Sequence, residues 1–481
     1  MKLNEIIYEN EYITSDIDLS FEINSIATSP DEVGERCLFI LENPNKMPSI
    51  KDFSQPPLAI LSADTADFPN CIPAVRVKNS RLMSALIHSR FFGIDFDEIS
   101  VIGVTGTNGK TTTAYMIYTV LNENNVKAGF IGTGRIEIKG KKISDSYYSM
   151  TTPDPCKLYR VLKKMQDEGC TKIVMEVSSH ALALDKVAPI PFEYGVFTNL
   201  SPEHTDFHSS MNDYFNTKLK LLNQSKNKVI NLDDTYGRAA AKMFDKGKIT
   251  VGAVWQGDYY ATNIEYTEKG ITYFTHSNKI CYKTMLNFHG IYNVYNSLLA
   301  SAVCIDMGIA PCLVKKSLSG FNGAEGRFEV IKGEIKAIID YAHTEEAYNN
   351  VLNELKRLKG NRILTVVFGC GGERDKTKRA KIASLVEKYA ERIIVTEDNS
   401  RNEDPEEIFS DIQKGFSQSR HRIIKDRKEA IKEAIFSSCP GDFVAVIGKG
   451  AEEYNLDKNG YTHFNDKEIV LSALKEYENK T

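Results

Sequence analysis

A glycine-rich turn followed by one lysine and three threonines occupies residues 106–113, GTNGKTTT. An apolar run precedes this turn and a helix-like stretch follows it. Gly106 and Gly109 allow the backbone to turn and to bring its N–H groups close to an anion, and a helix start adds partial positive charge. Lys110 can reach the β- and γ-phosphates of a nucleotide, and the Thr111 hydroxyl can bind Mg²⁺. The segment therefore predicts a phosphate-binding loop that uses ATP and Mg²⁺.

The match to the general pattern G-x-x-x-x-G-K-[ST] is incomplete, because Val104 stands where that pattern has its first glycine. The alternative is an ordinary tight turn between a strand and a helix, with a lysine on the surface. The order of strand, G-K-T and helix favours the phosphate loop.

A carboxylate ends the next predicted strand, KIVMEV at 172–177. Glu176 at the carboxyl end of a parallel strand beside a phosphate loop is placed to hold Mg²⁺ directly or through water. The alternative is the start of a helix that Ser178 and Ser179 cap, with Glu176 incidental. The residues alone leave both interpretations open.

Two histidines and an aspartate follow another predicted strand in TNLSPEHTDFH, 198–208. His204, Asp206 and His208 are two residues apart, which suggests zinc, but no fourth ligand has the usual spacing. One histidine that contributes to a Mg²⁺ or substrate site fits an ATP enzyme better. The other two residues are then expected in capping and loop roles.

An amphipathic helix is predicted at 212–222, NDYFNTKLKLL, and it contains Lys218. Most lysines on such helices are exposed on a charged face. The periodicity of the sequence therefore predicts an exposed Lys218.

Three polar turns follow successive predicted strands near the C-terminus: GCGGERDKTKR (369–379), EDNSR (397–401) and GKGAEE (448–453). The guanidinium groups of Arg374, Arg379 and Arg401 suit carboxylates. The side chains that suit an ammonium group are Asp398, Asn399 and Glu452. Together the turns predict a pocket for a zwitterionic amine, whereas a set of plain surface turns is the alternative. Within the first turn we interpret Cys370 as a small residue, not a nucleophile.

The alternation of strand-like and helix-like stretches predicts an α/β protein of three domains. Residues 1–96 are expected to form a small α/β unit. Residues 97–328 are expected to form a central P-loop ATPase domain with a mostly parallel sheet and helices on both faces. Residues 329–481 are expected to form a Rossmann-like domain, with a hinge at the turn residues 323–327.

The composition is that of a globular protein, with 42% hydrophobic and 26% charged residues in 481. The net charge of −4 favours neither nucleic acid nor anionic lipid as a partner. The sequence has nine scattered cysteines, no apolar run that could span a membrane and no signal-peptide pattern at its start. These features predict a cytoplasmic enzyme, which we expect to be a monomer.

Ten ordered segments resemble the Mur ligases, and among them the branch that adds diaminopimelate to a UDP-muramoyl dipeptide. They are GTNGKTTT (106–113), TTPDP (151–155), EVSSHAL (176–182), TNLSPEHTDFH (198–208), YNVYNSLLA (292–300), GRFE (326–329), DYAHT (340–344), GCGGERDKTKR (369–379), DNSR (398–401) and GKGAEE (448–453). The resemblance spans about residue 99 to the end. It implies an N-terminal domain for the UDP end, a central ATPase and a C-terminal domain for the amino acid.

The resemblance also implies roles for particular residues. Catalytic roles fall on Lys110, Glu176, His204 and Lys218, and the metal ligands are Thr111, Glu176, His204 and a carbamylated Lys218. Residues that bind ATP are Gly106, Thr107, Asn108, Gly109, Lys110, Thr111, Thr112, Asn293, Asn296, Arg327 and Asp340. The acceptor, a UDP-N-acetylmuramoyl dipeptide, is implied to contact Thr151, Thr152, Ser178 and Lys186. The amino acid, a diamino acid, is implied to contact Arg374, Asp398, Asn399, Arg401, Gly448 and Glu452.

The sequence departs from the family in four places. DNSR replaces DNPR, Ala451 replaces a histidine, and Lys186 replaces an arginine. Residues 25–40 lack the usual N-terminal motif. The retained Arg401 favours diaminopimelate, whereas a relative that adds L-lysine or uses another acceptor is the alternative. A nucleotide-binding regulator without catalysis is a third possibility, against which the retained Lys110, Glu176, His204 and Lys218 argue.

Overall fold

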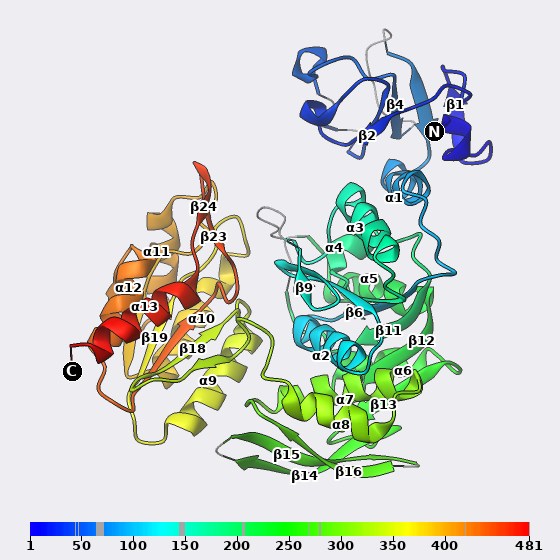
Figure 1. Ribbon diagram of the computed structural model, residues 1–481. Coiled ribbons are helices and arrows are strands. Elements are labelled where there is room, and N and C mark those ends of the chain that lie inside the picture. The colour runs from blue at the N-terminus through cyan, green and yellow to red at the C-terminus, as the bar shows by residue number, and fades with distance from the viewer. Residues whose placement is uncertain are drawn as a thin grey trace.

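The computed structural model describes residues 1–480 except 44, 47, 64–71, 144–149, 204–206, 268, 279 and 419. Figure 1 shows three bodies, each built around its own β-sheet. In the described residues no helix is both long and apolar enough to cross a membrane.

The N-terminal body is a five-stranded sheet in the order β1-β5-β4-β3-β2, in which only β1 runs antiparallel to its neighbour. The helix α1 packs on one face of this sheet through Met83 and Ile87. The elements are β1 (Tyr12–Ser15), β2 (Ser25–Ala27), β3 (Cys37–Leu41), β4 (Ala59–Ala63), β5 (Ala74–Val77) and α1 (Ser80–Phe91). A sheet and a helix of this kind are what we expect of a small α/β unit, although the bounds 1–96 remain a prediction.

The central body is an eleven-stranded sheet in the order β16-β15-β14-β13-β12-β11-β6-β10-β7-β8-β9. The strands from β14 to β7 run parallel, and antiparallel strands extend both edges. The strands are β6 (Ser100–Thr105), β7 (Ala128–Gly132), β8 (Arg135–Ile138), β9 (Lys141–Lys142), β10 (Lys172–Glu176), β11 (Phe192–Phe197), β12 (Ser225–Asn231), β13 (Lys248–Gly252), β14 (Tyr259–Thr267), β15 (Gly270–Ser277) and β16 (Ile280–Leu286). The mostly parallel sheet is confirmed.

Helices cover both faces of the central sheet. One apolar core lies under α2, α7 and α8, and a second lies under α3 and α4. The helices are α2 (Lys110–Glu123), α3 (Pro155–Asp167), α4 (Ser179–Ala183), α5 (Met211–Gln224), α6 (Thr235–Lys242), α7 (Tyr292–Asp306) and α8 (Pro311–Gly320). The carboxyl ends of β6, β10 and β11 therefore meet at one edge, where ligands of such sheets bind.

The C-terminal body is a six-stranded sheet in the order β17-β18-β22-β19-β20-β21, with only β17 antiparallel, and a separate hairpin. The strands are β17 (Glu329–Ile331), β18 (Lys336–Asp340), β19 (Leu364–Phe368), β20 (Arg392–Val395), β21 (His421–Ile423), β22 (Phe443–Ile447), β23 (Tyr454–Asp457) and β24 (Gly460–His463). The helices α9 (Glu345–Lys359), α10 (Thr377–Tyr389) and α11 (Pro405–Gln413) cover one face, and α12 (Arg427–Phe436) and α13 (Asp466–Glu478) cover the other.

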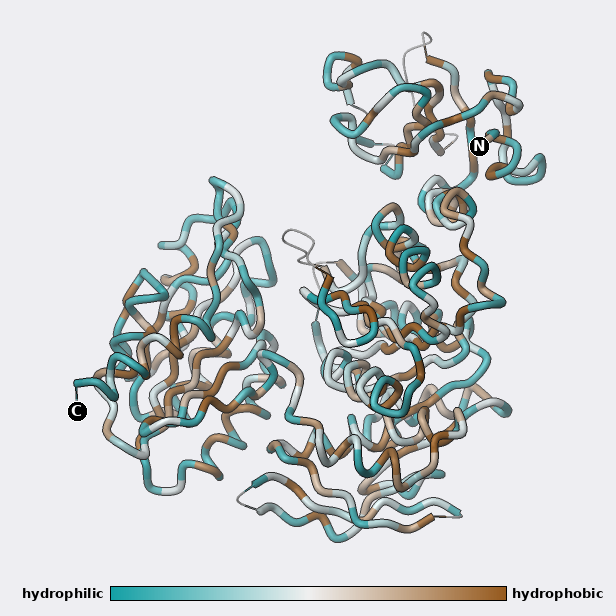
Figure 2. Tube along the Cα trace, viewed as in Figure 1, coloured by the Kyte–Doolittle hydropathy of each residue, from teal (hydrophilic) through white to brown (hydrophobic). Residues whose placement is uncertain are grey.

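Apolar residues line the strands of all three sheets, while the outer faces of the helices are polar, as Figure 2 shows. The strands β19 and β22 are buried along their whole length. A strand that helices cover on both faces is buried at every position and is therefore almost entirely apolar, and this explains why the runs LTVVF and FVAVI do not alternate.

Candidate active site

The phosphate-binding loop connects the end of β6 to the start of α2. Gly106 has φ 147° and Gly109 has φ 81°. A Cβ atom on Gly106 would lie 1.8 Å from Thr198 Oγ1, and one on Gly109 would lie 2.5 Å from Asn296 Oδ1. Both positions therefore require glycine, as much for lack of space as for their backbone angles. The loop leaves the N-terminus of α2 as an anion site.

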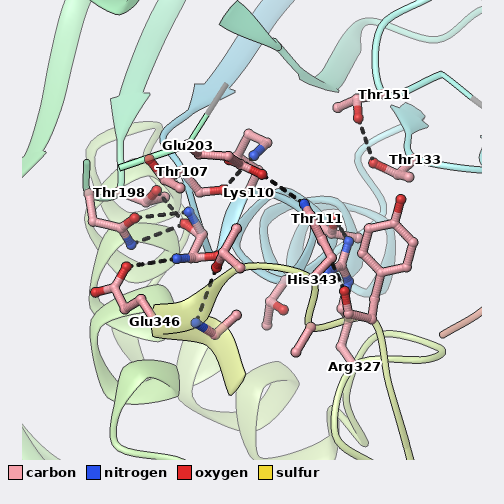
Figure 3. Close-up of a pocket in the computed structure, with 18 of the residues that line it drawn as sticks. Thr107, Lys110, Thr111, Thr133, Thr151, Thr198, Glu203, Arg327, His343 and Glu346 are labelled. Atoms are coloured by element: carbon pink, nitrogen blue, oxygen red, sulfur yellow. Dashed lines mark hydrogen bonds and ion pairs between the residues drawn. The ribbon is translucent and has the colours of Figure 1, made fainter. Parts of the chain in front are cut away.

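The segment after β11 holds this loop in place. Thr198 Oγ1 donates to the carbonyl oxygen of Asn108 at 2.6 Å. The Asn199 side chain accepts from Asn108 N at 2.9 Å and donates back to Asn108 O at 3.1 Å. Figure 3 shows Thr198 beside the loop residues Thr107 and Lys110. The loop conformation thus depends on two residues, Thr198 and Asn199, to which the sequence pattern assigned no role.

Two lysines converge on the first residues of the loop. Lys110 Nζ donates to Gly106 O at 3.0 Å and to Thr107 O at 2.7 Å. Lys218 Nζ donates to the same Gly106 carbonyl at 2.8 Å. Burial lowers the pKa of Lys110, although the carboxylates of Glu203 and Glu176 oppose this shift.

Lys218 is only 1% exposed, so the prediction of an exposed lysine is wrong. The buried face of α5 extends from Tyr214 to Leu222 and includes this position. Burial and the charge of Lys110 hold the pKa of Lys218 well below its usual value. A lysine with such a pKa is a ready source of the neutral amine that reacts with CO₂.

A hydroxyl and a carboxylate lie together at the first turn of α2. Thr111 Oγ1 donates to Glu176 Oε2 at 2.9 Å, and Thr133 N donates to Glu176 Oε1 at 2.8 Å. Thr133 in turn donates to Thr151 Oγ1 at 3.0 Å (Figure 3). Oxygen donors of this kind are those that Mg²⁺ prefers, so the residues present fit this ion.

The histidine segment is described only in part. His204 and Asp206 lie outside the described residues. His208 is buried, with Nδ1 at 3.6 Å from Asp213 Oδ2. In the described part of the chain no three acidic, histidine or cysteine side chains form a metal-binding cluster.

The residues assigned to the acceptor lie beyond Glu176 in the same cavity. Thr152 Oγ1 donates to Glu176 O at 2.9 Å and accepts from Ser178 N at 3.0 Å. Ser178 Oγ accepts from Ala181 N, so it caps α4 as the alternative interpretation of this segment expected. Lys186 forms an ion pair with Asp154.

The residues assigned to the nucleoside side of ATP come from α7 and from the segment before β18. Asn296 donates to Asn293 Oδ1 at 3.0 Å and accepts from Thr113 Oγ1 at 3.1 Å. Arg327 Nη2 donates to Thr111 Oγ1 at 3.0 Å, and its guanidinium lies 4.4 Å from the centre of the Tyr341 ring. These contacts connect the first turn of α2 to the connection between the second and third bodies.

Asp340 lies at the end of β18 and organises that connection. Its two carboxylate oxygens accept from Phe328 N at 2.7 Å and from Ala342 N at 2.6 Å. Burial raises the pKa of Asp340, which Arg327 and these two amides oppose. Phe328 has φ 47° and Gly326 has φ 65°, so the chain turns sharply here.

The three C-terminal turns meet as expected, and their assigned residues line the same cavity: Arg374, Asp398, Asn399, Arg401, Gly448 and Glu452. Asn399 Nδ2 donates to Glu452 Oε2 at 2.8 Å. Arg401 Nη1 donates to Gly372 O at 2.7 Å, which joins two of the turns. Burial disfavours the charge on Asp398, but Lys449 and Arg427 outweigh it and lower the pKa of Asp398.

Two residues of the first turn do not serve the pocket. Arg379 is fully buried, and its guanidinium binds two carboxylates of the protein, Glu403 at 2.8 Å and Asp411 at 3.0 Å. The expectation that it binds a carboxylate of the ligand is therefore wrong. A position on the buried face of α10 explains this difference. Burial raises the pKa of the Cys370 thiol to about 12, in agreement with its interpretation as a small buried residue.

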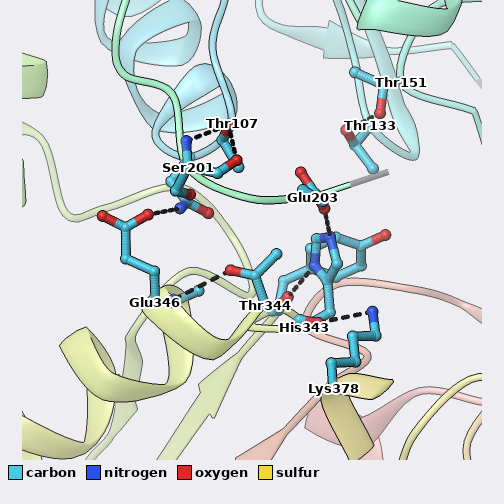
Figure 4. Close-up of polar contacts among 12 residues, drawn as sticks. Thr107, Thr133, Thr151, Ser201, Glu203, His343, Thr344, Glu346 and Lys378 are labelled. Carbon is cyan, nitrogen blue, oxygen red and sulfur yellow. Dashed lines mark hydrogen bonds and ion pairs between the residues drawn. The ribbon is translucent and has the colours of Figure 1, made fainter. Parts of the chain in front are cut away.

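A single cavity of about 840 Å³ connects most of the residues assigned to ATP, to the acceptor and to the amino acid. It is lined by the phosphate loop, by the acceptor residues and by the C-terminal turns. Two contacts close it across the bodies: Asn108 Nδ2 donates to Glu346 Oε2 at 2.9 Å, and His343 Nε2 lies 2.8 Å from Glu203 Oε1. Figure 4 shows Glu203 pointing to His343 and Glu346 pointing toward the loop.

Asp233, which follows β12, is one of the residues that line the cavity. The Asp233 carboxylate accepts from three consecutive backbone amides, Ala253 N, Val254 N and Trp255 N, at 2.7 to 2.9 Å. Trp255 is the single tryptophan of the chain and is 54% exposed. The guanidinium of Arg238 lies 5.0 Å from the centre of its ring.

Comparison with known proteins agrees with this geometry. Residues 104–304 match the Mur ligase middle domain, and residues 326–450 match the Mur ligase glutamate ligase domain. A UDP-N-acetylmuramoyl-L-alanyl-D-glutamate–2,6-diaminopimelate ligase of Clostridium acetobutylicum is 35% identical over 99% of this chain and 100% of its own. This chain belongs to the Mur ligase family. Its three-body α/β architecture is the fold of that family.

Other similar proteins support the same assignment. A ligase of the same name from Aquifex aeolicus is 40% identical over 84% of this chain and 83% of its own. Among solved structures, a 2,6-diaminopimelate ligase has a TM-score of 0.67, 28% identity and 99% coverage of both chains. Folylpolyglutamate synthase of Mycobacterium tuberculosis, solved with ADP, has a TM-score of 0.65 at 17% identity over 76% of this chain and 92% of its own, which shows a shared fold.

The similarity extends further than the sequence motifs indicated. The motif resemblance began near residue 99, whereas the match to the Clostridium acetobutylicum ligase covers 99% of the chain and so includes the N-terminal body. The motifs mainly did not indicate those residues that hold other residues of the site in place. Thr198 and His343 lie inside quoted motifs, but only the structure shows what they contact.

Proposed function

We propose that this chain is an ATP-dependent, ADP-forming ligase that adds meso-2,6-diaminopimelate to UDP-N-acetylmuramoyl-L-alanyl-D-glutamate during peptidoglycan synthesis. One observation carries the proposal: a single cavity is lined by a phosphate loop and by turns that bear both carboxylates and arginines. The names of the relatives support the choice of acceptor and amino acid, and do not favour the alternative of L-lysine.

We assign the three bodies to the three substrates. Residues 1–96 bind the UDP end of the acceptor, residues 97–328 bind ATP, and residues 329–481 bind the amino acid. The enzyme works as a monomer in the cytoplasm, where ATP and a UDP-linked acceptor are available. The location of the phosphate loop at the edge of the central sheet and of the arginine-bearing turns at the edge of the C-terminal sheet supports this division.

The reaction has two steps. In the first, an oxygen of the D-glutamate side-chain carboxylate attacks the γ-phosphorus of ATP, the bond to the β,γ-bridging oxygen breaks, and ADP leaves. In the second, the amine of the amino acid attacks the acyl carbon, inorganic phosphate leaves, and the nitrogen loses a proton. No nucleophile of the protein is needed, so the chain contributes positioning and electrostatic stabilisation.

The residues of the phosphate loop neutralise and orient the triphosphate. We assign the β- and γ-phosphates to the ammonium group of Lys110, which lies beside Thr107 O of the loop, and to the N–H groups at the start of α2. Asn293, Asn296, Arg327 and Asp340 bind the nucleoside side, while Thr151, Thr152, Ser178 and Lys186 bind the dipeptide of the acceptor. The arrangement of all these residues along one cavity supports these roles.

Thr111 and Glu176 are the described residues that would hold Mg²⁺, and we propose that His204 joins them. When bound, Mg²⁺ reduces the negative charge of the phosphates. Lys218 cannot be a ligand as an ammonium group, but its carbamate would be an oxygen ligand. Its complete burial beside Gly106 and its lowered pKa support a modified lysine at this position.

The proposal is tested by phosphate release with ATP, Mg²⁺ and UDP-N-acetylmuramoyl-L-alanyl-D-glutamate. We expect release with meso-diaminopimelate and little release with L-lysine or without an amino acid. Equal release with L-lysine would contradict the assigned amino acid but leave a ligase. If no amino acid supports release, the proposed acceptor or the proposed enzyme is wrong.

A further inference from the structure

Lys449 is a fully buried lysine directly behind the amino-acid pocket. It follows β22 within the turn GKGAEE, and its neighbours Gly448 and Glu452 line the cavity, whereas Lys449 does not. Its ammonium group donates to Asn399 Oδ1 at 2.8 Å and to Glu452 Oε2 at 3.3 Å. Asp398 Oδ1 lies 4.0 Å away. Such a buried charge is tolerated only where its partners are well placed.

The contacts of Lys449 fix the orientation of the Asn399 amide. Asn399 Oδ1 accepts from two donors, Lys449 Nζ and the backbone N–H of Leu456 at 2.9 Å. If the amide were turned over, its NH₂ group would face both of these donors, and neither could be satisfied. The oxygen of Asn399 must therefore point away from the ligand.

This orientation decides what the Asn399 side chain can offer to a ligand. One N–H of its amide donates to Glu452 Oε2 at 2.8 Å. The second N–H is left for a ligand, because Asn399 lines the cavity and its oxygen is already saturated. An amide that offers only a donor suits a carboxylate. The expectation that Asn399 accepts from an ammonium group does not fit this geometry.

The same lysine balances the charges of the pocket. Asp398 and Glu452 line the cavity as two carboxylates, and Lys449 is the cation in contact with both. With Lys449 in place, part of their negative charge is offset, and both carboxylates offer acceptors to an ammonium group. Asn399 and Arg401 remain donors. The pocket therefore separates the two charged ends of a zwitterion.

We propose that Lys449 is a positioning residue that sets the donor and acceptor polarity of the amino-acid pocket, by holding Asn399 as a donor for a carboxylate of the incoming amino acid. This inference rests on the proposed function and deepens it, since it assigns to each group of the pocket the part of the amino acid that it contacts.

The first test is the Lys449→Met variant of the full-length protein, assayed with ATP, the acceptor and meso-diaminopimelate. We expect the KM for diaminopimelate to rise at least tenfold, while the KM for ATP stays within twofold and kcat at saturating amino acid within threefold. Lys449→Arg, which keeps the charge and the donors, should recover part of this loss. Lys359→Met is the matched control, because Lys359 is a nearly buried, ion-paired lysine of the same body whose partner is Glu391.

The second test is Asn399→Asp, which decides the matter even if Lys449→Met does not fold. If Asn399 donates to a carboxylate, an aspartate there raises the KM for diaminopimelate at least tenfold. If Asn399 instead accepts from an ammonium group, the added negative charge leaves that KM unchanged or lowers it, and the inference is overturned. An unchanged KM in a folded Lys449→Met variant would also overturn it. A wild-type protein without diaminopimelate-dependent activity would instead refute the proposed function itself.

Discussion

At the scale of single residues, the two buried lysines near Gly106 show how far an environment can change a side chain. Lys110 and Lys218 donate to the same carbonyl oxygen, so two ammonium groups share one small volume. Burial lowers the pKa of each lysine, and the charge of Lys110 lowers the pKa of Lys218 further. The site thus holds a lysine that is chemically different from those on the surface.

Lys218 should make the stability of the protein depend on pH in a definite direction. Its pKa is lowered in the folded state and is about 10.4 in the unfolded chain. Between these two values the unfolded state binds one more proton, so the free energy of unfolding rises with pH. We therefore expect the stability advantage of Lys218→Met over the wild type in CO₂-free buffer to shrink from pH 7 to pH 10.

Thermal unfolding of both proteins at several pH values measures this effect. Added bicarbonate should stabilise the wild type and not Lys218→Met, because a carbamate forms only on the folded protein. If the difference in stability between the two proteins does not depend on pH, the buried amine of Lys218 stays charged. If bicarbonate stabilises both proteins, the effect argues against carbamylation of Lys218.

Arg401 should govern the affinity for the amino acid. Its guanidinium already joins two turns of the pocket through Gly372 O and Asn399 O. We expect Arg401→Ala to raise the KM for diaminopimelate by about thirtyfold or more, since removing one partner of a hydrogen-bonded charge pair costs about 2 kcal/mol or more. Steady-state kinetics with each substrate varied in turn gives the measurement. Equal increases in the KM for ATP and for diaminopimelate would argue against the assigned pocket.

At the scale of secondary-structure elements, the phosphate loop depends on contacts from another strand. Gly106 is packed against Thr198 and Asn199, which follow β11. Lys110 holds the loop from within through Gly106 O and Thr107 O, and Thr198 and Asn199 hold it from outside. The element that binds phosphate is therefore the loop together with the end of β11.

Gly106→Ala should abolish ATP binding while it lowers the stability of the protein only moderately. The new Cβ would overlap Thr198 Oγ1, and a left-handed φ costs a non-glycine residue about 1–3 kcal/mol. Gly320→Ala is a suitable control, since a Cβ there would meet nothing within 4 Å and its φ is not in the left-handed region. Calorimetry with ATP should detect no binding to Gly106→Ala and normal binding to Gly320→Ala. Normal binding to both would contradict the assigned loop.

The sequence predicted the elements better than the state of individual side chains. Apolar runs and the polar turns after them located β6, β10, β11, β19, β20 and β22, because buried parallel strands have a plain pattern. The amphipathic pattern also placed α5, but it did not show that the buried face includes Lys218. The prediction for Arg379 was wrong because its position is also on a buried helix face, and its partners Glu403 and Asp411 are distant in the sequence.

The antiparallel extension of the central sheet has a signal of its own in the sequence, although it was not predicted. Within β14 the run NIEYT alternates polar and apolar residues, whereas in β16 the burial of successive residues alternates but their polarity does not. The bodies 1–96, 97–328 and 329–481 remain predicted divisions, although each of the three large sheets lies within one of them.

At the scale of the whole molecule, two direct contacts close the cavity between the second and third bodies. Asn108 meets Glu346, and Glu203 meets His343, both near the start of α9 (Figure 4). Lys378 of α10 donates to His343 O at 2.9 Å and fixes the same segment. The start of α9 is thus the part of the third body that contacts the phosphate loop.

A double-mutant cycle can test this link. We expect Asn108→Ala and Glu346→Ala to each weaken ATP binding slightly, with a coupling of about 0.5–1.5 kcal/mol, the usual net worth of one hydrogen bond. Calorimetry on the four proteins gives the coupling. Glu345→Ala is the control partner, because Glu345 pairs with Lys381 of its own body and should show no coupling to Asn108. A coupling near zero for Glu346 would mean that the bodies meet differently in solution.

The Asp233 carboxylate that fixes residues 253–255 has an optical consequence. Because the chain has one tryptophan, excitation at long wavelength reports on Trp255 alone. Trp255 is half exposed, lies beside Arg238 and is attached through Asp233 to the lining of the cavity. Nucleotide entering the cavity beside Asp233 should therefore change the tryptophan emission. The unlabelled protein then contains its own fluorescent reporter for the binding of nucleotide.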